Sequence, residues 1–414
     1  MIFRGPMFDE GAAVSMRLKR FIEGIGNILG NDARRASFAT YVHGLLSEGE
    51  RKSVEPMVAR AFPDAERMDA EHQRLLHFIG VSDWCDRDVR RYAAQHALAA
   101  LTSREKVTGW ILDDTGFLKQ GKHSVGVQRQ YTGSAGKVTN CQVGVSLAIN
   151  TDTDHVPIDF ELYLPESWTN DPKRRRQARI PKRVKFKKKP ALALDMVRRA
   201  LDDGVPRGVV LADSGYGAST DFRAELQRLE LQYSVGVAAN TKVFEVGSPV
   251  VPGGRAVSLR NLANKLLAKR KFQRCTWREG TKQELTAKFA MVRVVTCRDA
   301  RRKRQPPPTT LWLLIEWRDD EAEPANYFFS NVAEATSLHE LVTITMQRWR
   351  IERTYQDLKG ELGLDHYEGR SYPGWNHHVS VTLCCYAFLV AERVRHFPPS
   401  ATGSAGADTD RSAA

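Results

Sequence analysis

The spacing of hydrophobic residues indicates helices in the first quarter of the chain. Apolar side chains recur at positions i, i+3, i+4, i+7 and i+8, and the stretch from Asp64 to Gly80 continues this style. A clear example is the set Phe38, Tyr41, Val42, Leu45 and Leu46. This period matches an amphipathic helix, whose apolar stripe faces a core. We therefore expect a helical N-terminal domain over residues 1–105.

Short apolar runs that are typical of strands begin after residue 105 and alternate with helical stretches. The run "GWILDDTG" comes first, "TNCQVGVSLAIN" follows it, and "GVVLADSGYG" has the continuous apolar character of a buried central strand. This alternation predicts a mixed α/β core. Residues 240–335 read mostly as strands separated by charged or proline-rich turns, which indicates a β-rich insertion. The expected division is a first part of the core at 106–239, the insertion at 240–335, helices of the core at 336–397 and a disordered tail at 398–414.

A long helix is expected from Ser337 onward, because this serine and the glutamate three residues later have the spacing of a capping box. The segment "RWRIERTYQDLKGELGLDHYEGR", residues 348–370, should belong to it. A helix turns by about 100° per residue, so Arg348, Glu352 and Lys359 project within about 40° of one another. They border the apolar stripe of the helix, whereas a solvated helix places its charges opposite the core. This placement indicates that the trio has a partner nearby.

Positive charge is concentrated in one segment. The 414 residues carry a formal net charge of +13, and 42% of them are hydrophobic, enough for a sizeable core. Residues 173–189, the basic run, hold eleven Lys or Arg and no acid, so the rest of the chain is nearly neutral. Such a run is either a solvated loop or a surface that binds a polyanion. Its candidate contacts are Arg174, Arg175, Arg176, Lys182, Arg183, Lys185, Lys187, Lys188 and Lys189.

The cysteines and the apolar runs favour a cytoplasmic protein without a membrane role. The six cysteines show no Cys-x-x-Cys spacing, which is typical of reduced thiols and not of a zinc site. The N-terminal segment lacks the apolar stretch of a secretory signal. The longest uncharged apolar run, residues 379–391, is too short to cross a bilayer and is better read as a buried helix.

Carboxylates end two of the expected strands, and another lies on the expected helix. Asp113 and Asp114 close the first strand, Asp213 closes the central strand, and Glu352 is on the helix. Side chains alternate along a strand, so Asp113 and Asp114 cannot both point the same way. Mg2+ and Mn2+ prefer carboxylate oxygens, and two such ions can activate a water and stabilise the leaving oxygen of a phosphodiester. The acids therefore predict a metal-dependent site that acts on phosphodiesters.

In these segments the sequence resembles the bacterial insertion-sequence DDE transposases, whose third block reads Y-x2-R-x3-E-x6-K. Arg348, Glu352 and Lys359 match that block at the family's spacing, and Thr345 stands where the tyrosine would be. The stretch "ADSGYG" looks like the second acidic block, and "LDDTG" looks like the first. The stretches "GKHSVGVQRQYTG" and "LYLPESW" also resemble one branch of these transposases. The resemblance covers residues 105 to 395.

The resemblance implies a fold and a site. The core would be ribonuclease-H-like, and Asp114, Asp213 and Glu352 would hold two Mg2+ or Mn2+ ions. We favour Asp114 as the first ligand because an acidic residue precedes the catalytic aspartate in some relatives, and Asp113 is the alternative. The residues expected to contact DNA are Arg348, Lys359, Tyr216 at the aromatic position of the second block, and those of the basic run.

The resemblance also implies a function. The protein would bind the terminal inverted repeats of its own element, with the helical domain at 1–105 taking part, and would cleave a phosphodiester to expose a 3′-hydroxyl. That hydroxyl would join the element to target DNA, and a homodimer would hold the two ends. A junction resolvase on the same fold and a DNA-binding protein that has lost catalysis are the alternatives.

Overall fold

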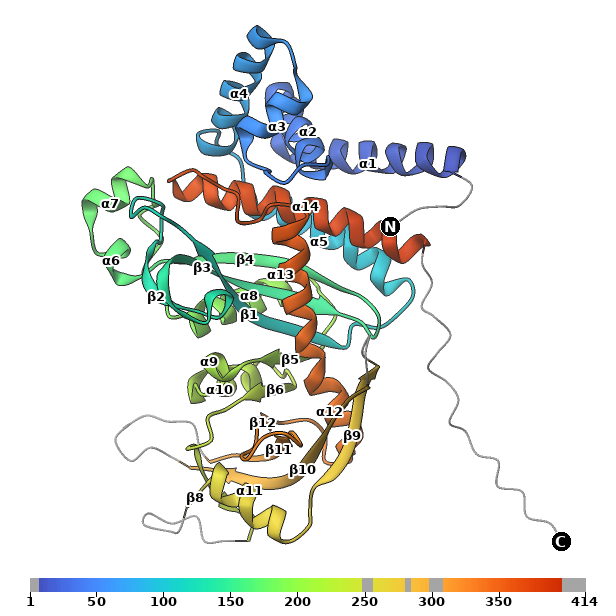
Figure 1. Ribbon diagram of the computed structural model, residues 1–414, viewed down its shortest axis with the longest axis vertical. Coiled ribbons are helices and arrows are strands. Elements are labelled where there is room, and N and C mark those ends of the chain that lie inside the picture. Colours follow the sequence, from blue (N-terminus) through green and yellow to red (C-terminus); the bar gives the residue numbers. More distant parts are fainter. Residues whose placement is uncertain (1–6, 248–255, 280–283, 298–307, 397–414) are drawn as a thin grey trace, which may run out of the picture.

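The computed structural model describes residues 7–247, 256–279, 284–297 and 308–396. The expected tail at 398–414 lies outside these residues. Within them the chain forms helices around one large mixed sheet, so the mixed α/β class predicted from the sequence is confirmed. Along the longest axis, the N-terminal helices come first, then the long C-terminal helix, then the core half of the sheet and finally the β-rich part (Figure 1).

The N-terminal part is helical, as the periodicity predicted. Asn31 and Asp64 cap two of its helices by accepting hydrogen bonds from backbone N–H groups of the first turn. Its helices are α1 (Met7–Leu29), α2 (Asp32–Leu46), α3 (Val54–Ala61), α4 (Ala65–Gly80) and α5 (Asp86–Thr102). The last of them, α5, packs along α14 (Tyr372–His396) and against β4 of the sheet (Figure 1). A separate DNA-binding domain at 1–105 stays a prediction, because α5 is shared with the body of the protein.

The core half of the sheet combines antiparallel and parallel strands. Its strands are β1 (Gly109–Leu118), β2 (Gln128–Thr132), β3 (Lys137–Asn150), β4 (His155–Tyr163), β5 (Val209–Ala212) and β6 (Tyr233–Gly236). β3 lies antiparallel between β1 on one side and β2 and β4 on the other. β1 and β5 are parallel, with Leu112 beside Ala212, and β5 and β6 are parallel too. The first residues beyond Leu112 and Ala212 are therefore neighbours at the point where the pairing of β1 and β5 stops, while β1 stays paired with β3.

The β-rich part continues the same sheet. Its elements are β7 (Lys242–Glu245), β8 (Val257–Ser258), α11 (Leu259–Ala268), β9 (Gln273–Glu279), β10 (Glu284–Thr296), β11 (Thr310–Trp317) and β12 (Asn326–Ser330). β12 pairs antiparallel with β6, where Phe329 lies beside Val235. The described residues thus form a twelve-stranded sheet, in which the expected insertion at 240–335 extends the core.

The expectation of one long helix from Ser337 through residue 370 is wrong. The capping box is confirmed and starts α12 (Leu338–Met346), but a 3-10 turn at 347–349 follows, and α13 (Arg350–Gly360) ends early. Gly363 has a left-handed backbone with φ of 62°, and the N–H of Leu364 donates to the carbonyl of Leu358 at 2.9 Å. This is the pattern of a glycine C-cap, which stops the helix and turns the chain so that Leu364 is buried.

The remaining helices cover the sheet. Between β4 and β6 they are α6 (Glu166–Thr169), α7 (Pro172–Gln177), α8 (Lys189–Asp202), α9 (Ser214–Gly217) and α10 (Thr220–Arg228). The apolar run at 379–391 lies within α14 and is buried except for Leu389, as expected. None of the helices in the described ranges is long and apolar enough to cross a membrane.

Candidate active site

Two of the predicted acids meet where the parallel pairing of β1 and β5 stops. Because Leu112 lies beside Ala212, Asp113 and Asp213 occupy neighbouring positions. The expectation that Asp113 and Asp114 close the first strand is wrong, because β1 continues to Leu118 in its pairing with β3. Asp213 follows the end of β5 and starts α9, since its Oδ1 accepts a hydrogen bond from the N–H of Gly215 at 2.9 Å.

Asp113 faces the start of α13 and is bound by Arg348, which lies in the 3-10 turn at 347–349 just before that helix. Nη1 of Arg348 lies 3.2 Å from Oδ2 of Asp113, and Nη2 lies 3.9 Å from Oε1 of Glu352. Burial raises the pKa of Asp113 to about 7; Arg348 opposes this shift, and the charge of Asp213 adds to it. A single guanidinium therefore lies between the acid of the strand and the acid of the helix.

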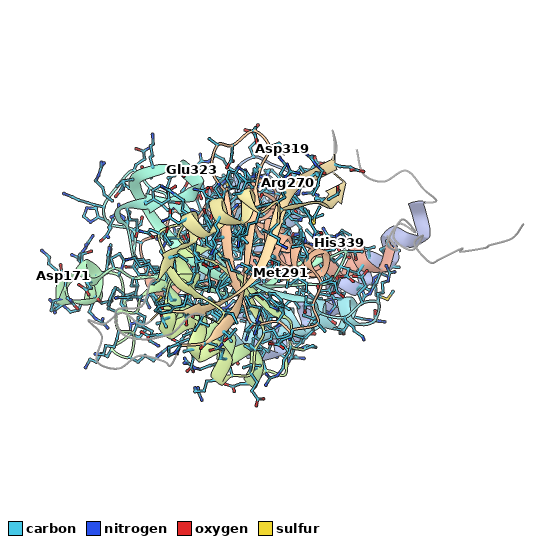
Figure 2. All side chains as sticks on the ribbon, turned by 90° about the horizontal axis from the view of Figure 1, so that it is seen from below. Asp171, Arg270, Met291, Asp319, Glu323 and His339 are labelled. Carbon is cyan, nitrogen blue, oxygen red and sulfur yellow. The ribbon has the colours of Figure 1, made fainter. Side chains whose placement is uncertain are left out.

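Glu352 opens onto a groove. Its side chain is 66% exposed. The groove is lined by Asp213, Arg348 and Glu352 on one side and by side chains of β9, β10 and the segment 316–328 on the other. Asp319 and Glu323, on the groove's outer side, are seen at the surface in Figure 2. An extended substrate could pass between the core helices and the β-rich part.

Asp114 points to the opposite face of β1, where its carboxylate is bonded to two side chains. Both of its carboxylate oxygens lie 3.0 Å from Nζ of Lys189, and the hydroxyl of Tyr216 donates to Oδ2 at 3.2 Å. Tyr216 is 1% exposed, so the contact with DNA that was predicted for it is not supported by this placement. The structure thus separates the two aspartates between which the sequence left a choice: Asp113 joins Arg348 and Glu352, and Asp114 does not.

Lys359 is used inside the protein. Its Nζ donates to the carbonyl of Gly116 at 2.7 Å and to Oγ1 of Thr115 at 2.8 Å, and it lies 5.3 Å from the centre of the Phe117 ring. Burial lowers the pKa of this lysine. In this position Lys359 anchors α13 to β1. Its predicted role at a DNA phosphate stays a prediction.

Three neighbours of the site were not identified from the sequence. The hydroxyl of Tyr355 on α13 lies 2.6 Å from Oγ of Ser146, which pairs with Asp113 in the β-ladder. Lys189 was assigned to the basic run, and its ion pair with Asp114 spans 75 residues. Tyr355 lies in the third block at three residues from Glu352, a helical spacing that could have suggested it. No comparable signal marks the other two.

Thr345, which replaces the family tyrosine, is buried. Its Oγ1 lies 2.7 Å from Oγ of Ser234 on β6. The residue therefore joins α12 to the sheet and does not line a surface with its hydroxyl.

The basic run is folded around one arginine. Arg175 donates to the carbonyls of Thr169, Pro181 and Val184, and Asp171 caps α7. Asp171 lies at one edge of the molecule, far from His339 on α12 (Figure 2). Several cations of the run are exposed and have no side-chain hydrogen bond or ion pair with any described residue: Lys173, Arg176, Lys182, Arg183, Lys185 and Lys188.

The positions and the chemistry of Asp113, Asp213 and Glu352 can be compared with what a divalent ion requires. No group of three or more His, Cys, Asp or Glu side chains in the described ranges is close enough to hold a metal as it stands. The donors nevertheless fit, because Asp113, Asp213 and Glu352 are all oxygen donors, and the first and last already share the cation of Arg348.

Comparison with known proteins identifies the family. A model described as DDE superfamily endonuclease matches residues 25–284, and a model described as transposase DDE domain matches residues 187–388. Because the first model covers more than half of the chain, the protein belongs to the DDE superfamily of endonucleases. The resemblance to insertion-sequence DDE transposases that the motif blocks indicated is confirmed.

Individual relatives can be named. The chain is 30% identical over 211 residues to a probable transposase for insertion sequence element IS701 from Microchaete diplosiphon, a match that covers 50% of each protein. It thus spans about half the length of this curated relative. Among solved structures, it is similar to the piggyBac transposase synaptic complex with hairpin DNA, with 10% identity and a TM-score of 0.41, covering 87% of this chain and 66% of the other.

Proposed function

We propose that the protein is a DNA transposase that cleaves the terminal inverted repeats of its own element and joins the 3′-hydroxyl ends to target DNA. One observation carries this proposal. Asp113, largely buried beside Asp213 where the parallel pairing of β1 and β5 stops, is linked through Arg348 to Glu352 on the facing helix. Acids held this way by rigid elements suit metal-assisted phosphodiester chemistry.

The core would be ribonuclease-H-like. It would consist of β1 to β6 with the helices between them, completed by α12 to α14. The β-rich part at 240–335 would form the far wall of the groove, and the helices at 1–105 would bind the repeats.

The ligand set is Asp113, Asp213 and Glu352, with Asp113 in place of Asp114. Asp114 already shares Lys189 and Tyr216 on the other face of β1, whereas Asp113 is on the face of Glu352. These residues would hold two divalent ions, Mg2+ or Mn2+, which supply an activated water and stabilise charge on the leaving oxygen.

Other residues would hold DNA and keep the site rigid. Lys359 anchors α13 to β1 and so fixes Glu352 relative to Asp113. Arg348 would exchange its carboxylates for a phosphate of the DNA end, because a guanidinium binds either anion in the same forked geometry. The exposed cations of the basic run would bind further phosphates.

The proposed reaction implies an oligomeric state for the active complex. Joining both ends of an element to one target requires two sites close together, so the active complex would be a homodimer. Such a protein would act in the cytoplasm, where bacterial DNA lies.

The test uses the inverted repeats that bracket the gene. A labelled repeat duplex is incubated in Mg2+ with wild type, Asp113→Asn, Asp213→Asn and Glu352→Gln, with gel-shift binding in parallel. We expect each variant to bind DNA and to lose cleavage by a factor on the order of a thousand, since a misplaced ion forfeits several kcal/mol.

Asp195→Asn is the matched control. Asp195 is a carboxylate on α8 that pairs with Lys187 and Arg198. It should cleave like wild type. Cleavage near the wild-type rate by Asp213→Asn or Glu352→Gln would refute the site, and cleavage by wild type without end joining would indicate a nuclease instead of a transposase.

A further inference from the structure

Asp114 lies at a junction of three elements on the face of β1 opposite Arg348. Its partner Lys189 is the last residue of the basic run and the first residue of α8. Its other partner, Tyr216, belongs to α9, the turn that Asp213 begins. The carboxylate of Asp114 therefore links β1, which also carries Asp113, to the turn of Asp213 and to the end of the basic run.

The turn that carries Asp213 is fixed against the sheet. A Cβ at Gly217 would lie 2.1 Å from the carbonyl oxygen of Gly236, and a Cβ at Gly236 would lie 2.7 Å from the backbone nitrogen of Ser214. Only glycines allow the backbones of α9 and β6 to approach this closely. A displacement of Tyr216 would therefore be passed directly to Asp213.

The ammonium group of Lys189 also offsets the negative charge of Asp114. Asp114 is adjacent to Asp113, which is itself buried beside Asp213. Like charges this close repel one another, and the ammonium of Lys189 lies between both oxygens of Asp114 at 3.0 Å. The side chains of Lys189 and Asp114 are 32% and 18% exposed, so water screens their pair only in part.

We propose that Asp114, Lys189 and Tyr216 form a positioning cluster. It fixes the end of the basic run to the strand of Asp113 and the turn of Asp213, so that DNA held by the run reaches the carboxylates in one register. This inference rests on the proposed function. It assigns to Asp114 a role in positioning, and it makes Lys189 part of the active-site structure, unlike the other cations of the run.

The test measures how DNA and Mn2+ binding depend on each other. Calorimetric titration gives the Mn2+ affinity with and without a repeat duplex for wild type, Asp114→Asn, Lys189→Met and Lys189→Arg. In wild type, DNA should raise the Mn2+ affinity about tenfold, a usual size for coupling between two sites. Asp114→Asn and Lys189→Met should bind each ligand alone within about threefold of wild type and lose this gain, and Lys189→Arg should retain it.

Mapping the cleavage position gives a second readout. Wild type and Lys189→Arg should cut at one phosphodiester, whereas Asp114→Asn and Lys189→Met should spread their cuts over neighbouring positions. Lys265→Met is the control for loss of a lysine charge, because this residue of α11 lies outside the basic run, pairs with Glu245 and has a side chain that is 46% exposed. It should keep both the gain and the single cut.

Each contrary result has one meaning. Loss of Mn2+ binding by Asp114→Asn in the absence of DNA would make Asp114 a metal ligand and overturn the inference. Unchanged coupling and unchanged cut position in Lys189→Met would reduce the pair to a structural contact and also overturn it. If wild type itself binds neither the duplex nor Mn2+, the proposed function has failed, and the inference fails with it.

Discussion

Asp159 of β4 is buried between two arginines that come from different elements. Its Oδ1 accepts a hydrogen bond from Nε of Arg90 on α5 at 3.2 Å, and its Oδ2 accepts one from Nη2 of Arg199 on α8 at 2.6 Å. Burial alone would raise the pKa of Asp159, but the two arginines outweigh it and hold that pKa below its usual value. The carboxylate thus joins the N-terminal helices to the core.

Replacing Asp159 by Asn keeps its size and removes its charge. Breaking a buried ion pair by removing one partner costs about 3–5 kcal/mol. Here Arg90 keeps Asp86 at 2.6 Å and Arg199 keeps Glu161 at 2.7 Å, so neither cation is left alone. We therefore expect the lower end, a loss of about 3 kcal/mol in the free energy of unfolding.

Urea unfolding followed by tryptophan fluorescence measures this loss, and Arg228→Gln is the control. Arg228 pairs with Glu225, and its side chain is 67% exposed. An exposed pair contributes less than about 1 kcal/mol. If Asp159→Asn costs no more than Arg228→Gln, the network does not hold α5 to the core.

The lowered pKa of Asp159 predicts how the stability difference between wild type and Asp159→Asn changes with pH. Because the pKa of Asp159 is lower in the folded protein, its contribution is present above the unfolded pKa of about 3.9 and is lost as pH falls below it. The difference between wild type and Asp159→Asn should therefore be full at pH 7 and shrink below about pH 4. A difference that grows on acidification would refute the reasoning.

Three further predictions concern acid stability, DNA affinity and metal binding. Burial lowers the pKa of His155 to about 3, so wild type should lose stability as pH falls below about 6.5, by about 2 kcal/mol at pH 5. Urea titrations at several pH values should show a smaller loss for His155→Gln. Replacing Lys182 and Arg183 by Ala should make the salt dependence of gel-shift affinity shallower by about 0.9 in log–log slope per lost phosphate contact, and an unchanged slope would leave the run a solvated loop. Arg348→Ala should still bind Mn2+ in calorimetry but weaken binding of cleaved ends; loss of Mn2+ binding would contradict its assignment to DNA.

The sequence was sufficient for features that depend on local pattern. Helical periodicity located the N-terminal helices, and apolar runs followed by carboxylates located β5 and the first half of β1, which continues to Leu118. The capping box at Ser337 marked the start of α12. These signals lie within a few residues of the feature they predict, so tertiary packing did not need to be known.

The end of α13 was missed although its signal was present. Gly360 and Gly363 lie inside the segment that was read as one helix, and a glycine after an apolar position is a usual helix stop. The charge pattern on Arg348, Glu352 and Lys359 was given more weight than these glycines. Glu352 and Lys359 lie on α13, which ends only after Lys359, whereas Arg348 lies in the 3-10 turn before it.

The choice between Asp113 and Asp114 could not be made from local pattern. Alternation shows that they face opposite sides of β1, but which side faces α13 depends on how the strand pairs and where the helix crosses. The contact on which the proposed choice rests, between Arg348 and Asp113, joins residues 235 positions apart. The burial of Tyr216 likewise follows from the packing of α9 on β6, which no local motif specifies.

Asp113 and Asp114 can take different roles on the two faces of the sheet only if β1 keeps its register. A shift of one residue would exchange their faces. A Cβ at Gly116 of β1 would lie 2.0 Å from Oγ1 of Thr132. If β1 shifted by one residue, Thr115 or Phe117 would bring a side chain to this place, so Gly116 keeps Asp113 toward α13 and Asp114 toward the basic run.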